Sequence, residues 1–144
     1  TPLYSSAASD VYKRQSYAIA LSSSADDYHH KSLVIAEQLK ASKTHLITTR
    51  AIILEIGNAL SKPKYRSKSI RLLSSLENDK TVTIISLLDT LYQKAFQLYC
   101  QRNDKNWGIV DCISFTVMGE RRITEALTTD IHFQQAGFRA LLRD

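Results

Sequence analysis

Cysteine, glycine and proline are scarce in this sequence of 144 residues, which holds two, four and two of them. So few turn-forming residues disfavour a β sandwich and favour helices joined by short loops. The two cysteines, Cys100 and Cys112, lack any metal-type spacing, so we expect neither a disulfide framework nor a cysteine zinc site, and a reducing cytoplasm is the expected location. Long apolar runs are also missing. The stretch AIILEI is far too short to span a bilayer and no secretory signal is visible, so we expect no membrane association.

The length and the charge are those of one ordinary globular domain with a basic balance. A chain of 144 residues is large enough for a single hydrophobic core. The formal net charge is +5. A basic excess of this size fits a polyanionic partner such as RNA without requiring one.

Apolar patterning predicts strands that alternate with helices. We expect buried strands over residues 44–49 and 81–86, a strand that ends at Asp130, and a last short strand within 138–142. Helices are expected over the segments between them, with Thr49 as the N-cap of the helix at 50–61. The β runs are continuously apolar, which is typical of a parallel sheet buried on both faces. Ligands of such sheets bind beyond the carboxyl ends of the strands.

Four acidic side chains stand at unusual places. Glu55 lies inside the apolar run AIILEIGNAL, Asp111 opens an otherwise apolar helix, Asp130 closes a strand, and Asp104 precedes Asp111 in a loop. Asp104, Asp111 and Asp130 could each cap a local element, and Glu55 could lean into solvent. If the topology brings them to one edge, their repulsion is relieved by a divalent cation, and oxygen ligands favour Mg²⁺ or Mn²⁺.

The sequence also resembles a known family. The stretches LITTRAIILEIGNAL, DKNWGIVDCISFTVMGE and EALTTDIHFQQAGFRALL are similar, in this order, to the PIN-domain family of metal-dependent ribonucleases, which includes the VapC toxins. The resemblance implies a three-layer α-β-α fold with about five parallel strands and an acidic pocket at the strand ends. Matched by residue, the second acid of the family falls on Glu55, the third on Asp111 and the last on Asp130. Asp104 resembles an additional acid of some members.

The resemblance also implies an activity. Glu55, Asp111 and Asp130 would be catalytic, and together with Asp104 they would hold one or two Mg²⁺ or Mn²⁺ ions that activate a water for RNA hydrolysis. It further implies a cognate antitoxin and, in many members, a homodimer. Six polar or basic residues complete the candidate set. Nearby hydrogen-bonding groups are Thr49, Asn58 and Thr128, and candidate RNA phosphate contacts on one helical face are Lys64, Lys68 and Arg71.

The segment DVYKRQ departs from the family pattern. The first metal-binding Asp of the family would fall on position 14, where this sequence has Arg14, followed by Gln15. One reading frame of a widely used transposon-end sequencing adapter encodes DVYKRQ. We therefore expect residues 1–15 to be a non-native scar that replaces the first strand of a PIN-like domain at 16–144, and the chain as written to be inactive. The rival interpretation is a naturally degenerate family member.

Two other classes of function stay open. A non-catalytic PIN-like module would bind RNA or a protein in a way that is indifferent to Mg²⁺. A phosphate-accepting receiver-like domain shares the α/β topology. It needs an acceptor Asp at the end of the middle strand, whereas TVTIIS leads into Ser86 and Leu87.

Overall fold

The computed structural model describes residues 11–13 and 28–143. The expected short apolar helix or corner at 16–21, as well as Arg14 and Gln15, lie outside these residues. The described elements, in chain order, are β1 (Val11–Lys13), α3 (His29–Ala41), β2 (Leu46–Thr49), α4 (Arg50–Ala59), α5 (Pro63–Asn78), β3 (Val82–Ile85), α6 (Asp89–Gln101), α7 (Ile109–Arg121), β4 (Glu125–Leu127), α8 (Ile131–Gln135) and β5 (Arg139–Ala140).

The strands form one parallel sheet in the order β3-β2-β1-β4-β5. The central strand is β1, in which Tyr12 is paired with Ile47 of β2 on one side and with Ala126 of β4 on the other. Because all the strands are parallel, their carboxyl ends meet at one edge. The expected α/β fold with a parallel sheet of about five strands is therefore confirmed.

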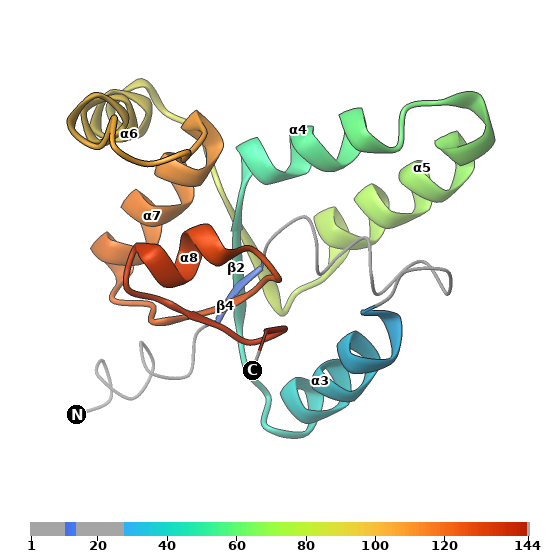
Figure 1. Ribbon diagram of the computed structural model, residues 1–144. Helices are drawn as coiled ribbons and strands as arrows, with labels where there is room; N and C mark the ends of the chain where they lie inside the picture. The colour runs from blue at the N-terminus through green and yellow to red at the C-terminus, as the bar shows by residue number, and fades with distance from the viewer. Residues whose placement is uncertain (1–10, 14–27, 144) are drawn as a thin grey trace.

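Successive residues of each strand face opposite layers of the molecule. Tyr12, Ile47 and Ala126 belong to a large core that includes buried residues of α4, α6, α7 and α8. Their neighbours Val11 and Leu46 belong to a smaller cluster on the other face, where Ile35 and Leu39 of α3 pack. Figure 1 shows the resulting layers, with α7 and α3 on opposite sides of the strands.

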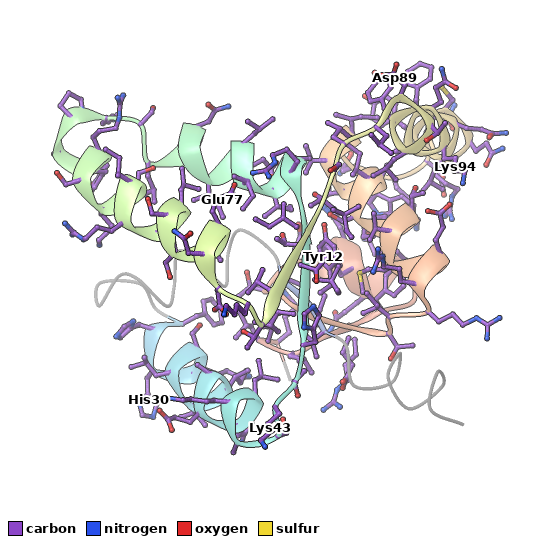
Figure 2. The ribbon with its side chains drawn as sticks, turned by 180° about the vertical axis from the view of Figure 1, so that it is seen from behind. Tyr12, His30, Lys43, Glu77, Asp89 and Lys94 are labelled. Atoms are coloured by element: carbon purple, nitrogen blue, oxygen red, sulfur yellow. The ribbon has the colours of Figure 1, made fainter. Side chains whose placement is uncertain are left out.

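Two side chains of the segment DVYKRQ suit a core, Val11 and Tyr12, and both are buried. Val11 is 3% exposed and Tyr12 is fully buried, near the centre of the molecule (Figure 2). The Tyr12 hydroxyl shares a hydrogen bond of 2.6 Å with Ser114 Oγ of α7. Its ring lies 6.2 Å, centroid to centroid, from that of Phe133 in α8. The central strand thus contacts both helices that carry the aspartates described below.

The helices agree with the sequence patterns, with two corrections. Thr49 caps α4 by accepting a hydrogen bond from Ile52 N at 3.3 Å, as predicted. The expected strand through Asp130 is wrong, because β4 ends at Leu127 and Asp130 begins α8 instead. The spacing of apolar residues along α6 predicts one buried face made of Leu88, Leu91, Tyr92, Ala95, Leu98 and Tyr99. This prediction is only half correct. Leu91, Ala95 and Leu98 pack inward, whereas a second set stays exposed to solvent: Leu88, Tyr92 and Tyr99.

None of the helices within 28–143 combines the length and the apolar character that crossing a bilayer requires. The helices α4 and α5 pack side by side (Figure 1). An ion pair between Arg50 and Glu77 joins the start of α4 to the end of α5.

Candidate metal centre

Asp111 occupies the third position of α7, at the carboxyl-terminal edge of the sheet. Its Oδ2 accepts a hydrogen bond of 3.0 Å from Gly108 N, the residue before the helix. The side chain is only 8% exposed. The expected capping role is therefore present, and the positive end of the α7 dipole stabilises the charge on this carboxylate.

Asp130 is the N-cap of α8 and the last residue of the short connection between β4 and α8. Its Oδ1 accepts a hydrogen bond of 2.9 Å from His132 N, and its own N–H donates to Thr128 Oγ1 at 3.0 Å. Thr128 is completely buried. A buried hydroxyl and a helix start thus fix the direction in which the Asp130 carboxylate points.

His132 brings the two aspartates into one group. Its Nδ1 lies 3.1 Å from Asp130 Oδ1 and 3.4 Å from Asp111 Oδ2. One donor atom of each of the three residues lies within 4.8 Å of the others. From the sequence, His132 beside Phe133 could touch a substrate, and packing on the last strand is the favoured interpretation. That placement is wrong, because the residue belongs to α8 and its ring nitrogen lies close to the carboxylates.

The geometry of this group fits a bound divalent cation. Two ligands at adjacent corners of an octahedron lie about 3.0 Å apart when each metal–ligand bond is 2.1 Å, and about 3.4 Å apart in a tetrahedron. The Nδ1 atom of His132 is buried, and among the described residues no hydrogen-bond partner satisfies it. Two carboxylates and an imidazole nitrogen are all common metal ligands.

Glu55 and Asp104 do not belong to this three-residue group. Glu55 follows the buried Ala51 by one turn of α4, so its side chain is half-buried and its Oε1 atom is shielded from solvent rather than turned fully outward. Asp104 is 58% exposed and pairs with Arg102, whose Nε and Nη2 donate to its two oxygens at 3.0 and 3.2 Å. This hydrogen-bonded guanidinium lowers the pKa of Asp104.

The remaining polar candidates divide by burial. Thr49 and Thr128 are fully buried at the ends of β2 and β4, where each accepts a backbone hydrogen bond. Asn58 is exposed near the end of α4. The structure therefore places the two threonines at the strand ends and Asn58 on the surface.

The predicted basic face lies on α5. Lys64 and Arg71 are exposed and Lys68 is half-buried. The ammonium of Lys64 lies 4.9 Å from the ring centroid of Tyr65. The face is accessible to a polyanion.

Trp107 fixes the loop that leads into α7. Its indole is 6% exposed, packs edge-on against Phe115 at 4.9 Å between centroids, and donates to Gln135 Oε1 of α8 at 3.1 Å. From the sequence, Trp107 could anchor this loop or stack on a base, with packing favoured, and the structure shows packing. Because Trp107 joins α7 to α8, it also fixes the position of Asp111 relative to Asp130.

One of the two cysteines, Cys112, lies inside α7 next to Asp111. Cys112 is fully buried, and desolvation, followed by the Asp111 carboxylate, raises the pKa of its thiol. Cys100 on α6 is exposed, and both cysteines are free thiols.

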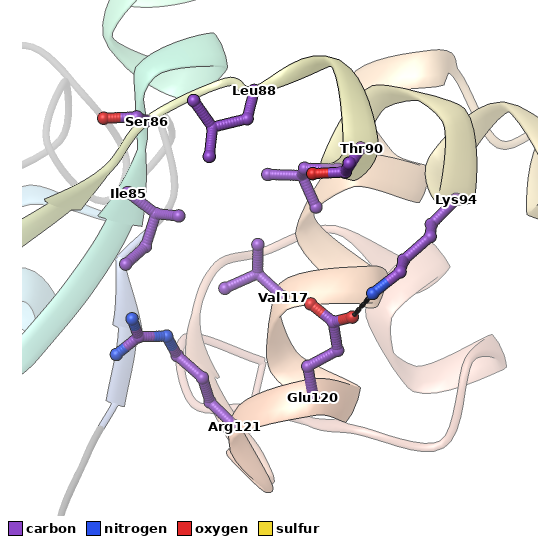
Figure 3. Close-up of a pocket in the computed structure, with 9 residues that line it drawn as sticks. Ile85, Ser86, Leu88, Thr90, Lys94, Val117, Glu120 and Arg121 are labelled. Atoms are coloured by element: carbon purple, nitrogen blue, oxygen red, sulfur yellow. Dashed lines mark hydrogen bonds and ion pairs between the residues drawn. The ribbon is translucent and has the colours of Figure 1, made fainter.

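A separate concavity of about 200 Å³ lies between the end of β3, α6 and the last turn of α7 (Figure 3). Lys94 Nζ donates to Glu120 Oε2 across it at 2.6 Å, and Arg121 lines the same space. Glu120 and Arg121 stand at the opposite end of α7 from Asp111. The pocket contains none of the predicted site residues.

Three comparisons with known proteins bear on this geometry. The family described as PIN domain matches residues 16–139. The crystal structure of VapC20 from Mycobacterium tuberculosis, described as a sarcin–ricin loop cleaving toxin, superposes with a TM-score of 0.77 at 22% identity, covering 89% of this chain and 95% of that one. No curated protein matches the sequence.

Proposed function

The chain belongs to the PIN domain family, and on that premise we propose that its fold is that of a Mg²⁺- or Mn²⁺-dependent endoribonuclease, the toxin of a type II toxin–antitoxin pair. One observation carries this proposal. Asp111 and Asp130, far apart along the chain, bring carboxylate oxygens to one edge of the sheet, with both atoms in a single group of metal-ligating donors. The printed description of VapC20 as a toxin that cleaves the sarcin–ricin loop supports RNA as the substrate class.

Asp111 and Asp130 are the proposed ligands of the cation. Gly108 N and His132 N each donate to one of them, which holds the carboxylates in place. When bound, a divalent cation lowers the pKa of a coordinated water and screens the charge that develops on the phosphate and on the leaving oxygen. The half-buried Glu55 would either join the ligands or orient the attacking water.

Thr128, Thr49, Asn58 and Asp104 complete the proposed site. The hydroxyl of Thr128 accepts a hydrogen bond from Asp130 N and so positions the backbone of Asp130. The hydroxyl of Thr49 accepts one from Ile52 N at the start of α4. Asn58 is proposed to contribute a hydrogen bond only after it turns inward from its exposed position. Asp104 would have to exchange Arg102 for the cation. Unchanged metal affinity in Asp104→Asn would remove it from the set.

We also propose that residues 1–15 replace a native first strand and that the chain as written cleaves RNA slowly or not at all. The family match begins at residue 16, which supports a domain of 16–144. Arg14 in place of an acidic ligand would change the local charge by two units. The uninterrupted genomic DNA upstream of the codon for Ser16 tests the scar: an Asp codon at the end of a strand-like segment is expected, whereas natural DNA that encodes DVYKRQ would overturn it.

RNA cleavage tests the activity. Purified chain is expected to show little Mg²⁺-dependent cleavage, and Arg14→Asp within a restored first strand is expected to recover it. Recovered activity should disappear in Asp111→Asn. Robust cleavage by the chain as written that Asp111→Asn abolishes would contradict the inactivity, and no gain on restoration would count against the scar.

The proposed RNA contact lies on α5. Neutralising Lys64, Lys68 and Arg71 together should weaken RNA binding. The slope of log Kd against the logarithm of the salt concentration should also fall by as much as about 2, because each lost contact with single-stranded RNA lowers it by about 0.7. An unchanged slope would assign these side chains to a solvated helix surface.

The remaining partners proposed are a cognate antitoxin and a second copy of the chain. Two free thiols support a reducing cytoplasmic location.

A non-catalytic RNA-binding or protein-interaction module is the alternative function. One observation favours it: both aspartates already serve as hydrogen-bond acceptors at helix starts, which is a structural role that needs no metal. Such a module would bind RNA with the same affinity in EDTA and in Mg²⁺, and would be indifferent to Glu55→Gln. A metal-dependent nuclease would respond to both.

A further inference from the structure

The ring of His132 is an unexpected member of the acidic group. The sequence pattern of the site predicts oxygen ligands alone, yet the buried Nδ1 atom lies 3.1 and 3.4 Å from one oxygen of Asp130 and one of Asp111. No described residue satisfies this nitrogen with a hydrogen bond. Polar atoms that are buried in this way require a partner, because their desolvation is otherwise uncompensated.

The Nδ1 atom of His132 approaches both carboxylates without a hydrogen bond to either. Both carboxylate oxygens lie within 3.4 Å of Nδ1, but neither is placed where a ring N–H would donate well to it. The lone pair of a nitrogen that binds a cation points at the cation. Seen from that nitrogen in an octahedral site, each adjacent ligand lies about 45° away from the direction of the cation, which is poor geometry for a hydrogen bond.

We propose that His132 Nδ1 is a third protein ligand of the cation, and that the site therefore prefers a first-row transition-metal ion such as Mn²⁺ to Mg²⁺. This inference rests on the proposed metal-dependent function of the same site. Imidazole is a softer ligand than a carboxylate. Mg²⁺ strongly favours oxygen and water, whereas transition-metal ions accept nitrogen readily.

The position of His132 on α8 makes this role possible. Its backbone N–H donates to Asp130 Oδ1, so the first turn of α8 holds the carboxylate and the ring together. The neighbouring Phe133 is fully buried and packs edge-on against Phe115 of α7 at 4.9 Å between centroids. The backbone of His132 is therefore fixed relative to α7, which carries Asp111. A site built from rigid neighbours holds its ligands before the metal arrives.

Mn²⁺ binding to the full chain, followed by electron paramagnetic resonance, tests the proposal. Electron spin-echo modulation reports a directly coordinated imidazole nitrogen, independently of any nuclease activity. We expect this nitrogen coupling in the wild type and its loss in His132→Ala. The affinity for Mn²⁺ should fall about tenfold or more in this variant. Mg²⁺ affinity, measured by competition, should change less than about twofold because Mg²⁺ gains little from nitrogen.

Two variants complete the design. His30→Gln is the matched control, because His30 is exposed on α3 (Figure 2) and should change neither affinity nor coupling. Arg14→Asp within a restored first strand is measured in parallel, so that the coupling is read there if the wild type binds too weakly. Thermal unfolding without metal verifies that each variant folds.

The outcomes separate this inference from the proposed function. Mn²⁺ binding that Asp111→Asn abolishes, but that shows no nitrogen coupling and survives His132→Ala, would overturn the histidine ligand and leave the carboxylate metal site standing. Nitrogen coupling that persists in His132→Ala would also overturn it. Binding of neither cation to the wild type or to Arg14→Asp would reject the metal centre itself, and the ligand with it.

Discussion

Replacement of Tyr12 by Phe tests whether the segment DVYKRQ truly occupies the centre of the sheet. Tyr12 is fully buried, and its hydroxyl contacts Ser114 Oγ at 2.6 Å. The substitution keeps the ring and removes one oxygen. Ser114 is also fully buried, so its hydroxyl loses this partner without gaining water.

The magnitude follows from this burial. A buried polar group that loses its partner costs about 1–3 kcal/mol in the free energy of unfolding. A serine in a helix can turn its hydroxyl toward a carbonyl one turn earlier, which recovers part of this cost. We therefore expect Tyr12→Phe to destabilise the protein by about 1–2 kcal/mol, in the lower part of that range. Ser114→Ala alone should cost a similar amount, and the double variant should cost less than the sum by about 1 kcal/mol.

Urea unfolding provides the measurement. Trp107 is the one tryptophan of the chain and is buried, so its fluorescence reports unfolding of the α7 side of the core. Tyr99→Phe is the control, since that ring is 45% exposed on α6 and should leave stability unchanged. Additive effects of Tyr12→Phe and Ser114→Ala, with a coupling below about 0.3 kcal/mol, would refute the placement of residues 11–13 between β2 and β4.

The further predictions concern Thr128, the two cysteines and Asp104. Thr128→Val removes the buried hydroxyl that accepts a backbone N–H at 3.0 Å, and should lower the free energy of unfolding in urea by about 1–2 kcal/mol. A thiol reagent should label exposed Cys100 rapidly and buried Cys112 only on unfolding. Because the pKa of Cys112 is raised in the fold, this thiol should also cost stability as the pH rises above 9.0, its ordinary value. Arg102 lowers the pKa of Asp104, so the stability that this carboxylate contributes is lost as the pH falls. The thermal unfolding temperatures of wild type and Asp104→Asn should therefore converge as the pH falls below 3.8 and through that depressed pKa.

Much of the fold was predictable because it depends on local pattern. Continuous β-branched runs predict the buried strands β2 and β3, and Thr49 predicts the start of α4. The run IVDCISFTVMGER predicts a helix over 109–121, and α7 has these bounds because its apolar residues are bracketed by Gly108 and by basic residues at its end. The parallel sheet followed from the alternation of these elements.

The sequence-based predictions were wrong where tertiary packing determines which residues are buried and where a strand ends. Tyr92 and Tyr99 have the spacing of a buried face, but α6 packs chiefly against α7, so only the side with Leu91 and Ala95 is covered. The end of β4 was misplaced because Asp130 was read as part of the strand. Its side chain instead accepts the N–H of His132, the second residue of α8, and so caps a helix that starts at the next residue.

The sequence by itself determined the class of the fold and the chemistry on offer, since hydrophobic periodicity and residue type act over a few neighbouring residues. Asp111 and Asp130 were recognisable as acids at the starts or ends of elements for that reason. Only the tertiary structure decided which of the acids meet: it joined these two, set Asp104 against Arg102, and turned the ring of His132 toward the pair. The physical reason is that donor–donor distances across a sheet edge depend on how α7 and α8 pack on the central strand, and no local pattern encodes the relative position of two helices.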